Sequence, residues 1–198
     1  MKRALWIGFA AAMLAIPVAA MVARAQRARL PSYGAVPSFS LVDQDGAKFD
    51  RAQLDGKVWV ADFVFTGCSL ACPRLTEEMA KLQKLVAGND KVRLISISVD
   101  PERDTPERLK AYAAGFRADA RQWKFLTGPA KQIEDAVVNG FKQGLSKDPD
   151  PSEKDGFAIL HGTRFVLVDQ TGQIRGFYDA QDASDMARLR AHLLGLVE

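Results

Sequence analysis

The chain has 198 residues, of which 47% are hydrophobic and 26% are charged, and its formal net charge is +3. This length and composition fit one globular domain with a short extension, because a chain of this size can bury a substantial core. The basic residues are mixed with acidic ones instead of forming one long block, which argues against nucleic acid as a partner.

Residues 1–29 differ from the rest of the chain. Lys2 and Arg3 precede a stretch from Ala4 to Ala23 without charged side chains, and three arginines follow it. The stretch has the length of about 20 residues that spans a bilayer, whereas the apolar part of a signal peptide has about 7–15. We therefore predict a membrane anchor at 1–29, with a cleaved signal segment as the alternative because Ala23-Arg24-Ala25 fits a cleavage site. By the positive-inside rule, the arginines after the span would place the domain on the cytoplasmic side of the membrane.

Residues 30–37 contain Pro, Ser and Gly and are predicted to be a linker, so the folded domain is predicted to cover residues 38–198. Its first element is an edge hairpin with strands at 39–42 and 48–50. The Asp-Gly pair between these strands favours the positive φ angles of a tight turn.

A central strand is predicted from Val58 to Phe65, where nearly every residue is apolar, β-branched or aromatic. A helix follows at once, with Pro73 in its first turn and apolar residues at helical spacing, namely Leu75, Met79, Leu82 and Val86. The pair Cys68 and Cys72 therefore lies where a strand turns into a helix.

Further strands and helices alternate along the rest of the chain. The predicted elements are a strand at 92–99, a helix from the Thr105–Pro106 pair to Phe116, a short strand at 124–126, a helix at 129–141, a polar loop at 144–156, a hairpin with strands at 164–169 and 173–178, and an amphipathic helix from Ser184. This order predicts an α/β protein with a thioredoxin-like fold, in which helices flank a central mixed sheet.

The only two cysteines are separated by three residues. A structural disulfide is one interpretation, although so short a loop removes little entropy from the unfolded chain. A redox dithiol and a thiolate pair for a soft metal are the others. Both are favoured by the helix N-terminus, which is expected to lower a thiol pKa, and by the spacing, which places Cys68 and Cys72 on one side of a helical turn.

Two histidines are present. His192 lies among apolar residues of the last helix and is interpreted as structural. His161 precedes the strand that begins at Arg164, where a packed histidine is the commoner case and a third metal ligand is the alternative. Two thiolates and one imidazole suit copper, because thiolate prefers the reduced ion and imidazole also accepts the oxidised ion.

Three segments resemble the Sco/SenC family, whose members help to assemble the copper centre of cytochrome c oxidase. Residues 65–75 resemble its copper-site motif, residues 96–107 its second signature, and His161 with residues 166–172 its third. Together they cover the chain from about Pro37 to its end. The resemblance implies that Cys68, Cys72 and His161 bind copper.

The resemblance also implies an anchor in the inner membrane with the domain in the periplasm, which overrules the orientation suggested by the arginines. Three residues depart from the family pattern. Ser69 replaces a common proline, Leu160 replaces an acidic residue, and Gly162 replaces Ser or Thr. Residues around a metal site commonly tune its affinity about 10–100-fold, so these departures are expected to alter copper affinity.

Asp62 is the only charged residue of the predicted central strand. The segment from Ala61 to Cys68 resembles thioredoxin, which has a buried aspartate at the same distance before its first active cysteine. A buried carboxyl group could exchange protons with a thiol. A structural Asp bonded to the backbone is the equal alternative.

The leading functional hypothesis is a metallochaperone that delivers copper to the copper-centre subunit of cytochrome c oxidase or to another cuproprotein. The alternative is a membrane-anchored thiol:disulfide reductase of the thioredoxin class, with Cys68 as nucleophile and Cys72 as resolving thiol. A redox sensor or scaffold is a third. A thioredoxin-like reductant or a copper donor are further expected partners. The three-residue spacing, and the absence of a proline after Pro151, favour the copper hypothesis.

Overall fold

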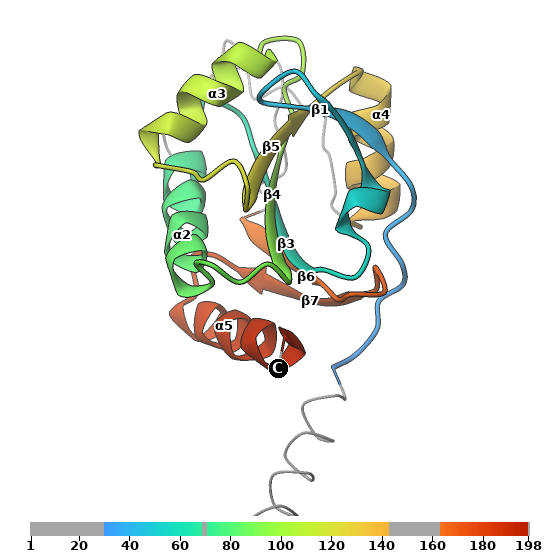
Figure 1. Cartoon of the computed structure of the whole chain (residues 1–198), viewed down its shortest axis with the longest axis vertical. Coiled ribbons are helices and arrows are strands. Elements are labelled where there is room, and N and C mark those ends of the chain that lie inside the picture. Colours follow the sequence, from blue (N-terminus) through green and yellow to red (C-terminus); the bar gives the residue numbers. More distant parts are fainter. Residues whose placement is uncertain (1–29, 69–70, 143–162, 198) are drawn as a thin grey trace, which may run out of the picture.

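The computed structural model describes residues 30–68, 71–142 and 163–197 (Figure 1). Its strands are β1 (Ser40–Asp43), β2 (Lys48–Asp50), β3 (Val58–Val64), β4 (Val92–Ser98), β5 (Trp123–Thr127), β6 (Arg164–Val168) and β7 (Ile174–Asp179). Its helices are η1 (Arg51–Leu54), α2 (Ala71–Leu85), α3 (Pro106–Gly115), α4 (Ala130–Glu134), the π-turn η2 (Asp135–Gly140) and α5 (Ala183–Val197). The predicted elements at 58–65, 92–99, 106–116 and 124–126 are confirmed to within one residue at each end.

The seven strands form one mixed sheet in the order β2-β1-β5-β4-β3-β6-β7. The three inner strands β3, β4 and β5 are parallel, whereas β6 is antiparallel to β3 and β1 is antiparallel to β5. The carboxyl ends of β3 and β4 therefore lie at the same edge as the start of β6. This edge, called the dithiol end below, receives the chain that leads from β3 into α2.

Helices cover both faces of the sheet, and the side chains of β3 divide between two cores. Val58 and Val60 face the core formed with α2, α3 and α5, while Trp59, Ala61 and Phe63 face the core formed with α4 and the N-terminal segment. All seven residues of β3 are buried. The prediction of a mixed sheet with flanking helices is confirmed.

The segment predicted as a linker makes backbone contacts with the edge of the sheet. Tyr33 N–H donates to the Ile174 carbonyl, Ile174 N–H donates to the Gly34 carbonyl, and Val36 N–H donates to the Gly172 carbonyl, each at 2.9 Å. These contacts lie at the end of the sheet opposite the dithiol end, because the end of β6 pairs both with the start of β3 and with the start of β7. The chain thus enters the domain far from the cysteines, and the predicted division at residues 30–37 stays a prediction.

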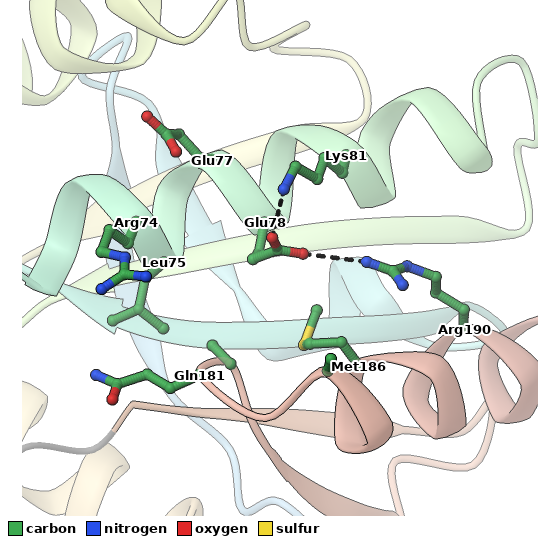
Figure 2. Close-up of a pocket in the computed structure, with 10 residues that line it drawn as sticks. Arg74, Leu75, Glu77, Glu78, Lys81, Gln181, Met186 and Arg190 are labelled. Atoms are coloured by element: carbon green, nitrogen blue, oxygen red, sulfur yellow. Dashed lines mark hydrogen bonds and ion pairs between the residues drawn. The ribbon is translucent and has the colours of Figure 1, made fainter.

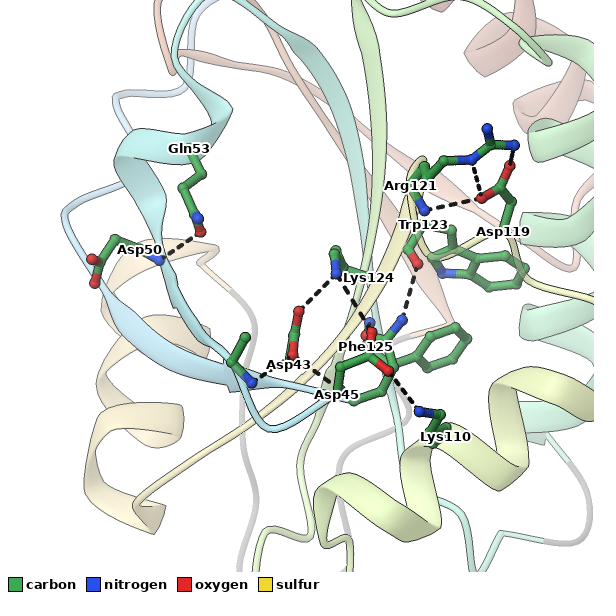
Figure 3. Close-up of polar contacts among 12 residues, drawn as sticks. Asp43, Asp45, Asp50, Gln53, Lys110, Asp119, Arg121, Trp123, Lys124 and Phe125 are labelled. Carbon is green, nitrogen blue, oxygen red and sulfur yellow. Dashed lines mark hydrogen bonds and ion pairs between the residues drawn. The ribbon is translucent and has the colours of Figure 1, made fainter.

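The edge hairpin of β1 and β2 is held by polar contacts that Figure 3 shows. One oxygen of the Asp43 carboxylate accepts the N–H groups of Asp45 and Ala47, at 3.0 and 2.9 Å, and the other accepts Lys124 Nζ at 2.7 Å. Gly46 has φ +78°, as the turn requires. The hairpin was predicted, but the lysine of β5 that neutralises its buried aspartate was not.

The helix predicted at 129–141 divides into α4 and the π-turn η2. The wider turn ends at Phe141, whose N–H donates to the Ala136 carbonyl at 2.9 Å. Phe141 is fully buried, and its ring contacts Trp59 and Phe63 at centroid distances of 5.7 and 5.2 Å. The π-turn thus departs from a regular helix at the place where the Phe141 ring packs against β3.

The predicted anchor at 1–29 and the predicted polar loop at 144–156 lie outside the described residues. Within the described part of the chain, no helix is both long and apolar enough to cross a bilayer. The anchor stays a prediction.

Candidate functional site

The two cysteines lie at the dithiol end, in the connection between β3 and α2. Cys68 N–H donates to the Phe65 carbonyl at 3.2 Å, which closes a turn directly after β3. Cys72 is the second residue of α2. Cys68 is partly exposed, Cys72 is 5% exposed, and no disulfide joins them. The predicted position at a strand-to-helix turn is confirmed.

The sulfur atoms of this pair have unequal surroundings. The Cys72 backbone N–H donates to Cys68 Sγ at 3.4 Å, so Cys68 carries the acceptor sulfur. Burial raises the pKa of the Cys72 thiol, a hydrogen bond with the backbone of Phe65 lowers it in part, and the hydrogen bond to Cys68 raises it by a smaller amount. The expectation that the helix N-terminus would lower the thiol pKa is therefore wrong for Cys72, because desolvation outweighs the helix dipole.

Asp62 lies on the face of β3 that α2 covers, and it is completely buried. Among the described residues neither of its carboxyl oxygens has a hydrogen-bond partner. Burial raises its pKa to about 7, although Ser96, beside it on β4, lowers it in part. The backbone of Asp62 itself also lowers this pKa in part, so both interpretations of Asp62 stay open. A carboxyl group that is partly protonated near neutral pH lies close enough to Cys72 to influence its pKa.

A second buried carboxylate holds the turn that carries Cys68. Asp104, which is fully buried, accepts hydrogen bonds from the backbone N–H and the hydroxyl of Thr66 and from the hydroxyl of Ser98. The distances from Thr66 N and Ser98 Oγ are 3.0 and 2.6 Å. The sequence identified Asp104 only as part of the second signature. It did not reveal that this carboxylate joins the turn after β3 to the end of β4, a set of contacts called the clamp below.

A hydroxyl chain reaches the helix start from α3. Thr76 Oγ1 donates to the Cys72 carbonyl at 2.8 Å, which uses its only proton, so the Tyr112 hydroxyl must donate to Thr76 Oγ1 at 2.8 Å. Burial raises the pKa of Tyr112, and the charges of Cys72 and Asp62 add to that rise. Sequence reasoning also missed this contact, since Tyr112 lies 40 residues after Cys72.

The predicted third ligand, His161, lies outside the described residues, as do Leu160 and Gly162. Among the residues described, no group of three or more His, Cys, Asp and Glu side chains could hold a metal ion. The structural interpretation of His192 is supported, because its Nδ1 lies 2.7 Å from the Tyr178 hydroxyl.

The segment of the third signature that follows β6 lies far from the cysteines. Asp169 accepts hydrogen bonds from Thr171 N, Thr171 Oγ1 and Gln173 N, at 2.9, 2.7 and 3.1 Å, and so closes the turn between β6 and β7. Val168 pairs with Trp59 at the start of β3, so this turn is at the end opposite the dithiol. Its role is structural.

Comparison with known proteins places these features in one family. Residues 28–197 match the sequence model of the SCO1/SenC protein family. The chain belongs to the SCO1/SenC family. The SCO1 protein homolog of Bacillus subtilis is 39% identical over 146 residues, which cover 73% of either chain.

Two solved structures of the Sco family share the fold. BsSco, described as a member of the Sco family of cytochrome c oxidase assembly proteins with a disulfide switch, is 33% identical with a TM-score of 0.72, over 84% of this chain and 96% of its own. ScoI of Bradyrhizobium japonicum with copper bound is 28% identical with a TM-score of 0.67, over 81% of this chain and 100% of its own. The Sco fold of this chain, with the cysteines at the end of β3, is thereby established.

Proposed function

We propose that this Sco protein binds copper through Cys68, Cys72 and His161 and assists assembly of the copper centre of cytochrome c oxidase. The observation that carries the proposal is the pair of unbridged cysteines, with Cys72 N only 3.4 Å from Cys68 Sγ. Relatives described as copper-bound and as oxidase assembly proteins support it.

The donor set fits copper. Thiolates are preferred ligands of Cu(I), and imidazole suits Cu(II) as well. β6 starts at the dithiol end, and only three residues of chain, which span at most about 11 Å when extended, separate Arg164 from His161. His161 is therefore within reach of this end of the sheet, whereas His192 is engaged by Tyr178.

The surroundings of the pair make copper binding dependent on pH. A thiol must lose its proton before it ligates a metal. Because burial raises the pKa of Cys72, this proton has to be displaced by the incoming ion at neutral pH. Copper affinity should thus rise with pH, and Asp62, buried near Cys72, is a neighbouring group able to take up a proton.

The test is a copper titration of the reduced full-length chain in detergent, compared with His161→Ala and with His192→Gln as the matched histidine control. We expect His161→Ala to weaken Cu(II) binding and to change its absorption spectrum, while His192→Gln binds as the wild type does. Equal affinity and spectra for all three proteins would contradict the three-ligand site.

A second candidate function, thiol:disulfide reduction, is favoured by the inequality of the two cysteines. The Cys68 thiolate would attack a partner disulfide, forming a mixed disulfide and releasing one partner thiolate. Cys72, after losing its proton, would then attack Cys68 Sγ, which releases the second partner thiol and leaves Cys68–Cys72 oxidised. Reduction of a copper-centre disulfide by a protein that binds no copper would favour this function over delivery.

We also propose that residues 1–29 anchor the protein in the inner membrane with the domain in the periplasm, where a thioredoxin-like reductant and a copper donor would be its further partners. Protease treatment of spheroplasts tests this placement. Degradation of the domain without cell lysis is expected, and protection would contradict it.

A further inference from the structure

A groove of about 310 Å³ lies between the first part of α2 on one side and, on the other, the segment that joins β7 to α5 and the first turns of α5. Its floor includes Leu75 and Met186, which are buried. Figure 2 shows Arg74, Leu75 and Gln181 gathered at one end and the contacts of Glu78 toward the other. The groove therefore has two chemically different ends.

The acidic residue inside the groove is already neutralised. Glu78 accepts Lys81 Nζ at 2.5 Å and an Arg190 guanidinium nitrogen at 3.1 Å. Glu77, the other carboxylate of the lining, points away from the segment of Gln181 (Figure 2). With three cations and two carboxylates, the lining has an excess of one positive charge.

Arg74 is the cation of this lining that has no partner among the described residues. It is exposed, and among the described residues it makes neither an ion pair nor a hydrogen bond. The Gln181 side chain, across the groove, likewise has no hydrogen-bond partner among them. A guanidinium and a side-chain amide that face one opening are donors suited to a carboxylate.

This end of the groove is also the one nearest the cysteines. Arg74 follows Cys72 by two residues in α2, whereas Lys81 lies seven residues farther along the helix. A protein segment that binds at Arg74 would therefore lie beside the end of α2 that holds Cys72.

We propose that the groove is the docking site for an acidic segment of the protein partner. A carboxylate of that segment binds Arg74 and Gln181, and an adjacent apolar side chain rests on Leu75 and Met186. The proposal rests on the proposed function only in taking the dithiol as the reacting group. It adds that the partner's reacting cysteine is flanked by an acidic residue.

The test uses the reduced full-length chain in detergent and peptides that carry one cysteine as a mixed disulfide with thionitrobenzoate. The peptides form matched sets with Asp, Asn or Lys at each of the four positions on either side of the cysteine. Attack by Cys68 forms the protein–peptide disulfide and releases thionitrobenzoate, whose absorbance gives the second-order rate constant. We expect one Asp peptide to react about three- to fivefold faster than its Asn counterpart, as an exposed Arg–carboxylate pair allows, and salt to reduce this preference.

Arg74→Glu should reverse the preference toward the Lys peptide. The variant should fold, because a carboxylate in the first turn of a helix is favourable. Lys131→Glu, which makes the same charge change in α4 on the other face of the sheet, should keep the wild-type preference. No Asp preference in the wild type, its survival in Arg74→Glu, or an equal change in Lys131→Glu would each overturn the docking proposal.

Neutral 4,4′-dithiodipyridine separates failure of the groove from failure of the thiol chemistry. Equal reaction of all three proteins with it, together with peptide rates that do not depend on charge, would overturn the docking proposal and leave the proposed function intact. Absence of reaction in the wild type would overturn both.

Discussion

Asp62, in β3, and Asp104, in the loop after β4, are both inaccessible to solvent and lie near the dithiol end, but their surroundings differ. Asp104 accepts bonds from Thr66 and Ser98 and ties the loop after β4 to the turn after β3. Asp62 has no hydrogen-bond partner among the described residues, and its pKa is raised to about 7. Two equally buried carboxyl groups therefore act differently: Asp104, which is hydrogen-bonded, fixes the turn, whereas Asp62, which is not, destabilises the fold and can titrate.

The clamp predicts the largest loss of stability. Asp104→Ala leaves the N–H of Thr66 and two hydroxyl groups without their acceptor, and we expect the free energy of unfolding to fall by about 3–5 kcal/mol. Urea denaturation followed by circular dichroism measures it. Asp169→Ala is the matched control, because Asp169 closes a turn with three similar bonds at the opposite end of the sheet.

Both variants should be less stable, but only Asp104→Ala should change the reactivity of Cys68, since only its turn carries that residue. The same change of thiol reactivity in both variants would show that Asp104 acts through general stability alone.

Asp62 predicts a loss of stability as pH rises. Between pH 4 and 7 the native protein keeps a proton on Asp62 that the unfolded chain has released, so stability falls with rising pH. The difference between the ordinary value of 3.8 and about 7 sets an upper limit of about 4 kcal/mol. Asp62→Asn should remove this slope, with the largest gain relative to wild type above pH 7. Urea denaturation from pH 4 to 8 measures it, and parallel curves for both proteins would contradict the raised pKa.

The same carboxyl group should affect the reaction rate of Cys72. When Cys72 resolves a mixed disulfide at neutral pH, Asp62 is the buried group able to accept its proton, and Asp62→Asn should slow this step about tenfold. Stopped-flow release of the second partner thiol measures the step. Release of the first thiolate by Cys68 is the internal control and should keep its rate, whereas an unchanged second step would leave Asp62 without a role in proton transfer.

Regular elements could be predicted from local pattern, but the contacts of the site could not. The run of apolar residues at 58–65 and the Thr105–Pro106 pair indicated β3 and α3, whose residues follow one another in the chain. The clamp joins Thr66 to Asp104, 38 residues apart, and depends on the parallel pairing of β3 with β4. The raised pKa of Cys72 depends on how completely the folded chain buries its side chain, which periodicity does not reveal. The role of His161 still rests on family resemblance.

The Tyr112 hydroxyl makes more hydrogen bonds than Asp62 and fewer than Asp104, and we expect it to make the smallest contribution to stability. Among the described residues its hydroxyl has one partner, Thr76 Oγ1, which in turn donates to the Cys72 carbonyl. Tyr112→Phe removes one hydrogen bond but leaves Thr76 able to donate, so the free energy of unfolding should fall by only about 1 kcal/mol.

Urea denaturation of Tyr112→Phe beside Thr76→Val distinguishes support of the helix start from simple packing. Thr76→Val keeps the volume but removes both bonds of the chain, and it should be the more destabilising change. If Tyr112→Phe lowers the free energy of unfolding as much as Asp104→Ala does, the hydroxyl chain stabilises the helix start as strongly as Asp104 stabilises its turn. The number of hydrogen bonds that a buried polar group makes would then not predict its contribution to stability near the dithiol.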